Sequence, residues 1–423
     1  MAEIKVPFHK AAITKDEETA VLDVLRSGWL TTGKYALEFE KKFSASVSDT
    51  VQMAENRKKA DLPADEVISL AVNSNTSGMI LAMEACGVCQ GTAVITTPYT
   101  FVSTATCARH LNADVFFADI EKDTYNIDSD KIEEILKKDA APGGVDGKGS
   151  NRVRAIVPVH IAGNVCDMPR IMQLAKKYST PERPIRVIED AAHSYPSPTA
   201  LGFAGTIADA GVFSFYVTKT ITTAEGGMVC TRNKDLARRM TVMRMHGMDR
   251  TTWDRYTSPR ASWEYDIIAP GYKFNLPDVL AALGCCQVDR AQIFYEQRKR
   301  IVEKYNQAFS KLDFITLPPD GQGNSWHLYL MRIVPEKLKI TREEFAKQMQ
   351  QAGLGISVHF IPIFHFTYWQ KLYPDFTAQN FPNAERQYST TISIPLFPDM
   401  TDEQANLVID TVTKIGNENR REA

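Results

Sequence analysis

Apolar runs of strand length alternate with helical patterns through the first two-thirds of this chain. The expected strands are Val67–Val72, Ala93–Thr97, Asp114–Ala118, Val153–Val159, Ile185–Glu189, Gly211–Phe215 and Met228–Thr231. The expected helices lie near Ser77–Ala85, Val102–Leu111, Ser129–Lys138, Pro169–Tyr178 and Lys234–Met243. Such alternation predicts an α/β fold with a mostly parallel central sheet covered by helices. Ligands bind beyond the carboxyl ends of the strands in such sheets, so residues 73–78, 190–194 and 214–219 should lie close together.

The pattern changes after Gly271. A long helical stretch from Leu276 to about Leu312 is expected to lead into a smaller α+β domain. The elements expected there are strand Leu328–Val334, helix Arg342–Ala352, strand Ile356–Phe360 and helix Asp402–Ile415. We therefore expect an N-terminal arm and large domain over residues 1–275, and a connecting helix with a small C-terminal domain over residues 276–423.

Two segments interrupt this order of elements. Asp49–Glu66 carries many charges and a proline, and Ala141–Arg152 holds four glycines and no apolar run. Both compositions are typical of solvent-exposed loops or excursions. We expect that a short flexible linker could replace residues 49–66 without loss of folding.

The composition is that of an ordinary globular protein, with 44% hydrophobic and 24% charged residues. The net charge of −2 and the even spread of basic residues give no indication of nucleic-acid or membrane-surface binding. No apolar stretch approaches the roughly 20 residues of a membrane helix, and the N-terminus lacks a signal-peptide core, so we expect a cytoplasmic protein. Cys86 and Cys89 have metal-ligand spacing, but no second pair accompanies them, and we expect reduced thiols without a metal.

A carboxylate and a lysine follow two of the expected strands. Asp190 ends one strand, and Lys219 follows another within a segment rich in threonine. Pyridoxal phosphate (PLP) needs a lysine to hold its aldehyde and a carboxylate beside its ring nitrogen, so that the ring stays protonated and can accept electrons. We therefore predict that Lys219 and Asp190 are catalytic residues of a PLP site. The alternatives are a surface lysine in a loop and an aspartate that caps the next helix.

Hydroxyl groups at strand ends could hold the phosphate of the same cofactor. Thr76 and Ser77 follow a predicted strand and open a helix, where unpaired N–H groups favour a phosphate. An ordinary helix cap is the simpler interpretation of these two residues. Ser214, at the end of a later strand, is expected to add a hydrogen bond to the phosphate.

Four stretches carry a resemblance to one family. They are Glu189–Ser194, Phe213–Thr231, Gly271–Asp278 and Ile394–Met400. In this order they resemble the DegT/DnrJ-type nucleotide-sugar aminotransferases, and the similarity runs from about Ile13 to about Val412. The resemblance implies the fold of the PLP-dependent transferases of fold type I, the aspartate aminotransferase fold.

The resemblance also implies roles for residues around the cofactor. Phe101, with Tyr99 as second choice, would stack on the ring, although aromatic residues more often belong to the core. His193 would contact the phenolic oxygen of the cofactor. Asn275 would reach the phosphate bound by a neighbouring subunit, so the active sites of a homodimer would be shared. The N-terminal arm, Pro7–Thr32, would lie near the active site across this interface.

Substrate contacts are implied more weakly for His359, Lys273 and Tyr216. The function that the resemblance implies is transfer of an amino group from glutamate to a UDP- or dTDP-linked 4-keto or 4-keto-6-deoxy sugar, for glycan, lipopolysaccharide or antibiotic synthesis. A 3-keto nucleotide sugar and a non-catalytic PLP-binding regulator remain alternatives. Related sugar dehydratases have a histidine in place of the lysine, and Lys219 argues against that activity.

Overall fold

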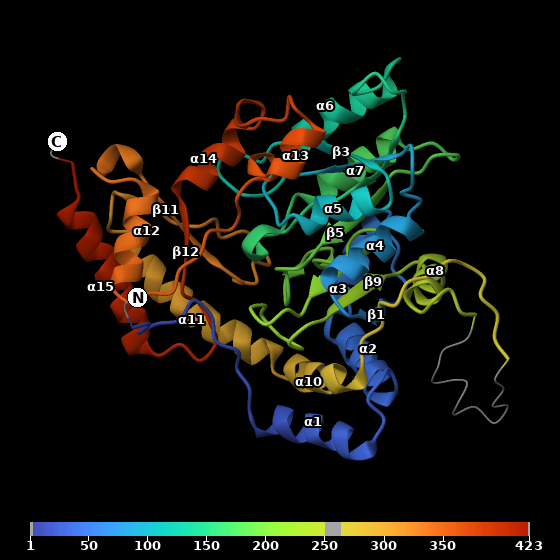
Figure 1. The fold of residues 1–423 in the computed structure, drawn as a ribbon, viewed down its shortest axis with the longest axis horizontal. Coiled ribbons are helices and arrows are strands. Elements are labelled where there is room, and N and C mark those ends of the chain that lie inside the picture. Colours follow the sequence, from blue (N-terminus) through green and yellow to red (C-terminus); the bar gives the residue numbers. More distant parts are fainter. Residues whose placement is uncertain (1–2, 250–263, 422–423) are drawn as a thin grey trace.

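A seven-stranded sheet forms the centre of the computed structural model, which describes residues 3–249 and 264–421 (Figure 1). Its strands are β1 (Ile68–Val72), β2 (Ala93–Thr96), β3 (Asp114–Phe117), β4 (Val153–Ile156), β5 (Arg186–Asp190), β8 (Ala210–Ser214) and β9 (Gly227–Thr231). The order is β1-β9-β8-β5-β4-β2-β3, and β9 runs antiparallel to its neighbours β1 and β8. The remaining pairs are parallel, which confirms the predicted α/β fold with a mostly parallel sheet.

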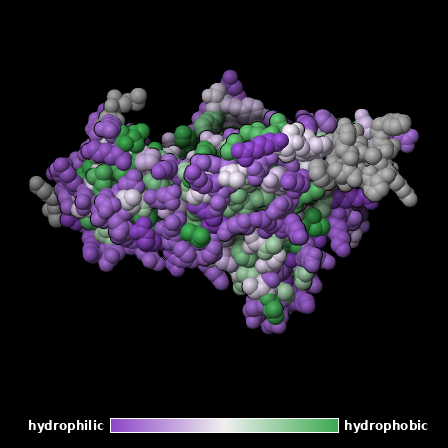
Figure 2. All heavy atoms as spheres, turned by 90° about the horizontal axis from the view of Figure 1, so that it is seen from below, coloured by the Kyte–Doolittle hydropathy of each residue, from purple (hydrophilic) through white to green (hydrophobic). Residues whose placement is uncertain are grey.

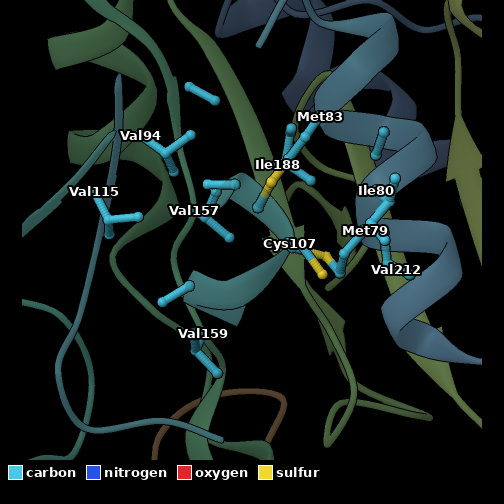
Figure 3. Close-up of a cluster of buried hydrophobic side chains, with 14 of the residues drawn as sticks. Met79, Ile80, Met83, Val94, Cys107, Val115, Val157, Val159, Ile188 and Val212 are labelled. Atoms are coloured by element: carbon cyan, nitrogen blue, oxygen red, sulfur yellow. The ribbon is translucent and has the colours of Figure 1, made fainter. Parts of the chain in front are cut away.

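Helices cover this sheet in the predicted places. They are α4 (Asn75–Ala85), α5 (Ser103–His110), α6 (Ser129–Ala140), α7 (Met168–Tyr178) and α8 (Lys234–Arg244). Helix α4 is buried on nearly all sides, and Figure 3 shows Met79 and Met83 pointing from it toward Ile188 and Val212 of the sheet. A Cβ atom at Gly78 would lie 2.6 Å from Val212, so this glycine lets the helix press against β8.

The C-terminal part has a sheet and a core of its own. Strands β10 (Ile315–Thr316), β11 (Tyr329–Ile333) and β12 (Thr391–Ile394) pair antiparallel in that order. Helices α12 (Arg342–Gln351) and α15 (Asp402–Glu418) pack against each other and share an apolar cluster with the three-stranded sheet. Val6 from the N-terminus joins this cluster.

The predicted connecting helix is two helices that meet at Arg290 (Figure 1). The first, α10 (Asp278–Asp289), packs against α1 (Lys15–Ser27) and α2 (Lys34–Ser46). The second, α11 (Ala291–Phe309), places Phe294 in the cluster around α2 but Ile301 in the C-terminal cluster. We therefore propose that the change from the large to the small domain falls inside α11, within the stretch predicted as the connecting helix.

The prediction of a strand at Ile356–Phe360 was wrong. Only Ser357 pairs, through a single bridge to Ser393 of β12. Beyond this bridge the chain leaves the sheet, because His359 and Phe360 turn toward the large cavity described below.

Residues 49–66 are largely exposed, as expected, but they are not an irregular loop. They contain helix α3 (Val51–Lys59), and the side chain of Arg57 is completely buried. Its guanidinium donates hydrogen bonds to the carbonyl oxygens of Pro63 (2.7 Å) and Leu201 (2.7 Å). A linker without Arg57 would leave the Leu201 carbonyl, which lies outside the segment, without this donor, so we now expect the replacement to cost stability. Residues 141–152, by contrast, form an irregular and largely exposed loop, as expected.

The face of the molecule in Figure 2 is mainly hydrophilic, with small separate apolar spots. Among the helices of residues 3–249 and 264–421, none is long and apolar enough to span a membrane.

Candidate active site

A cavity of about 400 Å³ lies at the carboxyl ends of β1, β5 and β8. Its lining residues are Ser74, Asn75, Thr76, Thr100, Phe101, Ser103, Val159, Asp190, Ala192, His193, Ser214, Tyr216, Thr218, Lys219, Glu225, Gly226, His327, His359 and Phe360. Three segments that the sequence placed at strand ends therefore meet, as predicted. Eight of the eleven predicted site residues line this cavity, and Ser77, Lys273 and Asn275 do not.

Lys219 sits in a turn directly after β8, where its backbone N–H donates to the carbonyl oxygen of Tyr216 (2.9 Å). The cavity walls remove water from the amine, which lowers the pKa of Lys219 to about 8, against the opposing effect of Asp190. An amine with this pKa is far more often neutral near pH 7 than an exposed lysine. A neutral amine is the form that attacks a carbonyl group.

Asp190 ends β5, and other groups hold its carboxylate in place. The Thr104 hydroxyl donates to Oδ2 (2.7 Å), and the Ala192 backbone N–H donates to Oδ1 (3.2 Å). The Asn75 amide bridges from Oδ1 (3.5 Å) to the carbonyl oxygen of Val212 (3.0 Å). Burial raises the pKa of Asp190, and the hydrogen bonds and Lys219 partly offset this rise. A cationic ring nitrogen beside Asp190 would favour its ionised form.

The N-terminus of α4 opens into the cavity beside Asp190. Ser74 caps the helix, its hydroxyl accepting from the backbone N–H of Ser77 (3.1 Å). Thr76 lines the cavity, whereas the Ser77 hydroxyl donates to the side-chain oxygen of Asn73 (2.5 Å). In this structure, then, Thr76 is free to meet a phosphate, and Ser77 acts within the helix cap.

The glycine pair that follows Lys219 lets two chain segments approach each other. A Cβ atom at Gly227 would lie 2.8 Å from the backbone nitrogen of Asn75, so a larger residue would push β9 away from α4. The left-handed conformation in this turn belongs to Ala224 (φ 67°) instead. These glycines therefore serve close packing at the mouth of the cavity.

The two aromatic candidates have different roles. Phe101 is 59% exposed although it lines a cavity, so much of the residue remains accessible to a ligand. Tyr99 is completely buried, and its hydroxyl donates to the carbonyl oxygen of His359 (2.7 Å). Tyr99 is thus a core residue that supports the cavity wall, and Phe101 remains the candidate for stacking. Tyr216, which is 45% exposed, also lines the cavity.

Three histidines line the cavity, one just after β5 and two from the C-terminal part of the chain. Nδ1 of His193 accepts from the backbone N–H of Ala162 (3.1 Å), and Nδ1 of His359 is 2.9 Å from the Ser393 hydroxyl. Burial and the nearby Lys219 lower the pKa of His359 to about 3 and lower the pKa of His193 well below its ordinary value. His327 packs on His193, with ring centroids 4.4 Å apart, and burial also lowers its pKa. These shifts all favour the neutral form of the three rings.

Asn275 and Lys273 lie outside the cavity of their own chain. The Asn275 amide donates to the Thr32 hydroxyl (2.6 Å), and Lys273 donates to the Asn275 side-chain oxygen (2.5 Å). Asp278, three residues on, accepts backbone N–H groups of Gly33 (2.7 Å) and Ala36 (2.9 Å). The motif that contains Asn275 therefore packs against the end of the N-terminal arm.

The start of the N-terminal arm lies beside the cavity of the same chain. The ring of Phe8 stacks on that of His359 with a centroid distance of 5.5 Å.

Sequence reasoning missed four residues that shape the site. Asn75 and Thr104 hold Asp190, and His327 and Phe360 complete the wall that contains His193. Thr104 follows the aromatic segment by a few residues, but its contact joins positions 86 apart in sequence. Only the folded chain brings such groups together.

The residues at the cavity fit PLP. An amine, a carboxylate, a helix N-terminus with a hydroxyl beside it and an open aromatic face correspond to the aldehyde, ring nitrogen, phosphate and ring of that cofactor.

Comparisons with known proteins agree with this fit. The profile of the DegT/DnrJ/EryC1/StrS aminotransferase family matches residues 11–413. The spore coat polysaccharide biosynthesis protein SpsC of Bacillus subtilis is 36% identical over 413 residues, 97% of each chain. Spr1654 of Streptococcus pneumoniae, described as a sugar aminotransferase and solved in its pyridoxamine phosphate (PMP) form, has a TM-score of 0.82 at 28% identity, covering 98% of this chain and 100% of the other.

The aminotransferase PseC of Helicobacter pylori, involved in pseudoaminic acid biosynthesis, has a TM-score of 0.79 at 25% identity, covering 98% and 99% of the two chains. The PLP form of Spr1654 matches this chain equally closely, with a TM-score of 0.81. The predicted fold, the enzyme class and the PLP cofactor are thereby confirmed. The chain belongs to the DegT/DnrJ/EryC1/StrS aminotransferase family.

Proposed function

We propose that this aminotransferase moves the amino group of glutamate to a nucleotide-linked keto sugar, with a UDP- or dTDP-linked 4-keto sugar as the favoured acceptor. The observation that carries the proposal is the cavity in which Lys219, Asp190 and Thr76 meet. The names of SpsC and PseC support a sugar acceptor, because both belong to polysaccharide or sugar-acid synthesis.

Each cavity residue has one part in this proposal. Bound PLP would supply a carbonyl that holds amines and a ring that accepts electrons from the carbon being deprotonated. Thr76, Ser214 and the N-terminus of α4 would bind the phosphate, and Phe101 would hold the ring by stacking. Asp190 would keep the ring nitrogen protonated, and the hydrogen bond from Thr104 would hold its carboxylate in position for this.

Lys219 would hold the cofactor at rest and move a proton during transfer. A pKa of about 8 suits both tasks, because the amine can lose and regain a proton near neutral pH. Glutamate would leave its amino group in the first half-reaction, and the sugar would receive it in the second. His359 and Tyr216, which also line the cavity, would contact the sugar.

We also propose a homodimer with shared sites. Asn275 lies outside the cavity of its own chain, near the end of the N-terminal arm, where a neighbouring subunit could receive it. In that arrangement Asn275 would reach the phosphate held by the partner, and Lys273 would lie near the partner's substrate.

A screen of acceptors tests the proposed function. The purified protein is converted to its PMP form with glutamate and then mixed with UDP- or dTDP-linked 4-keto and 3-keto sugars. We expect a 4-keto sugar to remove the absorbance of the PMP form. Preference for a 3-keto sugar would favour the alternative acceptor, and a failure of glutamate to form PMP would indicate a different amino donor.

A further inference from the structure

Lys219 lies in a loop between β8 and β9 that contains no helix or strand. Two backbone hydrogen bonds close the base of this loop, from the N–H of Phe215 to Gly226 (2.9 Å) and from the N–H of Thr223 to Phe215 (3.0 Å). The Thr222 hydroxyl also donates to the Phe215 carbonyl oxygen (3.0 Å). A contact that holds Thr222 from outside the loop therefore also restrains the position of the lysine.

Gln287, in the last turn of α10, makes such a contact. It is only 2% exposed, and its Oε1 accepts from the backbone N–H of Thr222 (3.3 Å). Its Nε2 donates to the Ala12 carbonyl oxygen (3.0 Å) and to the Glu17 carboxylate (2.8 Å). One buried amide thus joins the loop of Lys219, helix α10 and the N-terminal arm.

The partners of this amide determine its orientation. The Ala12 carbonyl and the Glu17 carboxylate only accept, so exchanged positions of Oε1 and Nε2 would place oxygen against oxygen. Glu17 is buried, and it also accepts from the backbone N–H of Thr14 (2.8 Å) and from Arg290 (2.8 Å). Burial disfavours the charged form of Glu17, but its hydrogen bonds outweigh that effect and lower its pKa. An ionised carboxylate is a strong acceptor for the Gln287 amide.

The arm also covers a small cavity beside the lysine. Lys219, Thr222 and Gln287 line this cavity together with residues 9–12 of the arm, and its volume of about 10 Å³ has room for at most one water molecule. Because Lys219 lines both this cavity and the large one, a displaced arm would give the lysine room to move away from a ligand. A displacement of about 1 Å can lower the rate of a reaction about 100-fold.

We propose that Gln287 is a positioning residue for Lys219, because it fixes the loop that carries the lysine to the N-terminal arm. Gln287 does not line the large cavity, so it acts through the loop and not through a contact with a ligand there. The inference rests on the proposed role of Lys219 in holding PLP, and it is independent of the amino donor and the sugar acceptor.

PLP binding in two backgrounds tests this role. Gln287→Met removes the three hydrogen bonds of the amide, and Gln292→Met, at an exposed position of α11, is the matched control. In the chain with native Lys219, Gln287→Met should weaken PLP binding about 3- to 10-fold. In Lys219→Ala, where PLP binds without a covalent bond, the same change should alter the affinity less than about twofold. Equal losses in both backgrounds would show a merely structural role, and no loss in either would also contradict the proposal.

The pH dependence of PLP attachment gives a second readout. A loosened loop admits water to the amine, so the pKa of Lys219 should rise from about 8 toward its ordinary value. At pH 7 the attachment of PLP to Gln287→Met should then be about 3- to 10-fold slower than in Gln292→Met, and the rate should level off at a higher pH. An unchanged pH profile would contradict the positioning role.

Gln287→Glu serves the same comparisons if Gln287→Met does not fold. It keeps an acceptor for the Thr222 N–H but loses both donors and places a second carboxylate beside Glu17, so the same direction of change is expected. Borohydride treatment and peptide mapping then show which lysine holds PLP. PLP on a different lysine would overturn the proposed role of Lys219 and this inference with it. Attachment to Lys219 that neither variant affects would overturn this inference alone.

Discussion

Two walls of the same cavity are built by different means. The sheet wall (Thr76, Asp190, Ser214 and Lys219) lies at strand ends and in the turns that follow them, and three hydrogen-bond donors fix the Asp190 carboxylate. The C-terminal wall (His327, His359 and Phe360) lies outside the described strands. The structure thus separates a wall at strand ends, suited to cofactor chemistry, from a wall in irregular segments of the C-terminal part, suited to a particular substrate.

Removal of the lysine from the sheet wall should have the largest effect. Lys219→Ala loses both the covalent hold on PLP and the group that moves the proton, so turnover should fall by at least about 10²–10⁴-fold. The visible absorbance of lysine-bound PLP should vanish, although PLP can still bind without a covalent bond. Lys176→Ala, on the surface, is the matched control and should behave as the unaltered protein. Normal turnover in Lys219→Ala would show that Lys219 takes no part in the reaction.

A smaller loss is expected from Asp190→Asn. An amide cannot stabilise a cationic ring nitrogen, and loss of one fixed electrostatic partner costs on the order of 10²–10³-fold in rate. PLP should remain attached to Lys219, which absorbance can check. Thr104→Val, which removes only a hydrogen bond to Asp190, should cost less. Near-normal turnover in Asp190→Asn would indicate a structural role for this carboxylate.

Mixing of variant subunits tests whether Asn275 of the partner subunit completes the cofactor site. Asn275→Ala should weaken PLP binding by about 5- to 150-fold, as expected for a lost phosphate contact. This variant and Lys219→Ala should each be inactive as homodimers and regain activity when their subunits exchange, since one site of the mixed dimer then has both native residues. The assay is run at a PLP concentration that saturates the unaltered protein but not the Asn275→Ala homodimer. Exchange without recovered activity, or full activity of Asn275→Ala alone, would contradict the shared site.

The pH dependence of cofactor attachment probes the environment of Lys219. The neutral amine attacks the aldehyde, and its pKa of about 8 lies below the ordinary value because burial disfavours the ammonium ion. The rate at which PLP-free protein gains lysine-bound absorbance should therefore rise about tenfold from pH 7 to pH 9 and then level off. A rate that keeps rising beyond pH 10 would show an unperturbed lysine.

Changes in the C-terminal wall should be smaller and should affect a different step. His359→Phe loses the hydrogen bond to Ser393 and any contact with the sugar, so KM for the sugar should rise about 3- to 10-fold. PLP affinity and the first half-reaction with glutamate should change little. Steady-state kinetics with varied sugar, together with single-turnover kinetics with glutamate, separate these effects. Equal losses of rate in the glutamate and sugar half-reactions would show that the two walls do not serve different steps.

The two walls also differ in how well sequence predicts them. Asp190 and Ser214 follow apolar runs whose alternation with helices places their ends at one edge of the sheet, so both positions could be predicted. The contacts of Asn75 and Thr104 with Asp190 depend on packing between distant segments, and no local pattern encodes them. Ile356–Phe360 has the apolar content of a strand, but His359 and Phe360 turn into the cavity.

The buried side chain of Arg57 shows that composition also fails to predict single contacts within a mostly exposed segment. A charged segment is usually solvated, yet this guanidinium is buried where backbone carbonyls of another loop need donors. Charge content alone could not distinguish residues 49–66 from the exposed loop at residues 141–152.

The site of covalent PLP attachment tests the central claim most directly. The purified protein is treated with borohydride, which fixes the bond between PLP and lysine, and its peptides are then identified by mass spectrometry. We expect modification of the peptide that contains Lys219, together with loss of the visible absorbance of lysine-bound PLP. Modification of a different lysine, or none at all in a protein saturated with PLP, would contradict it.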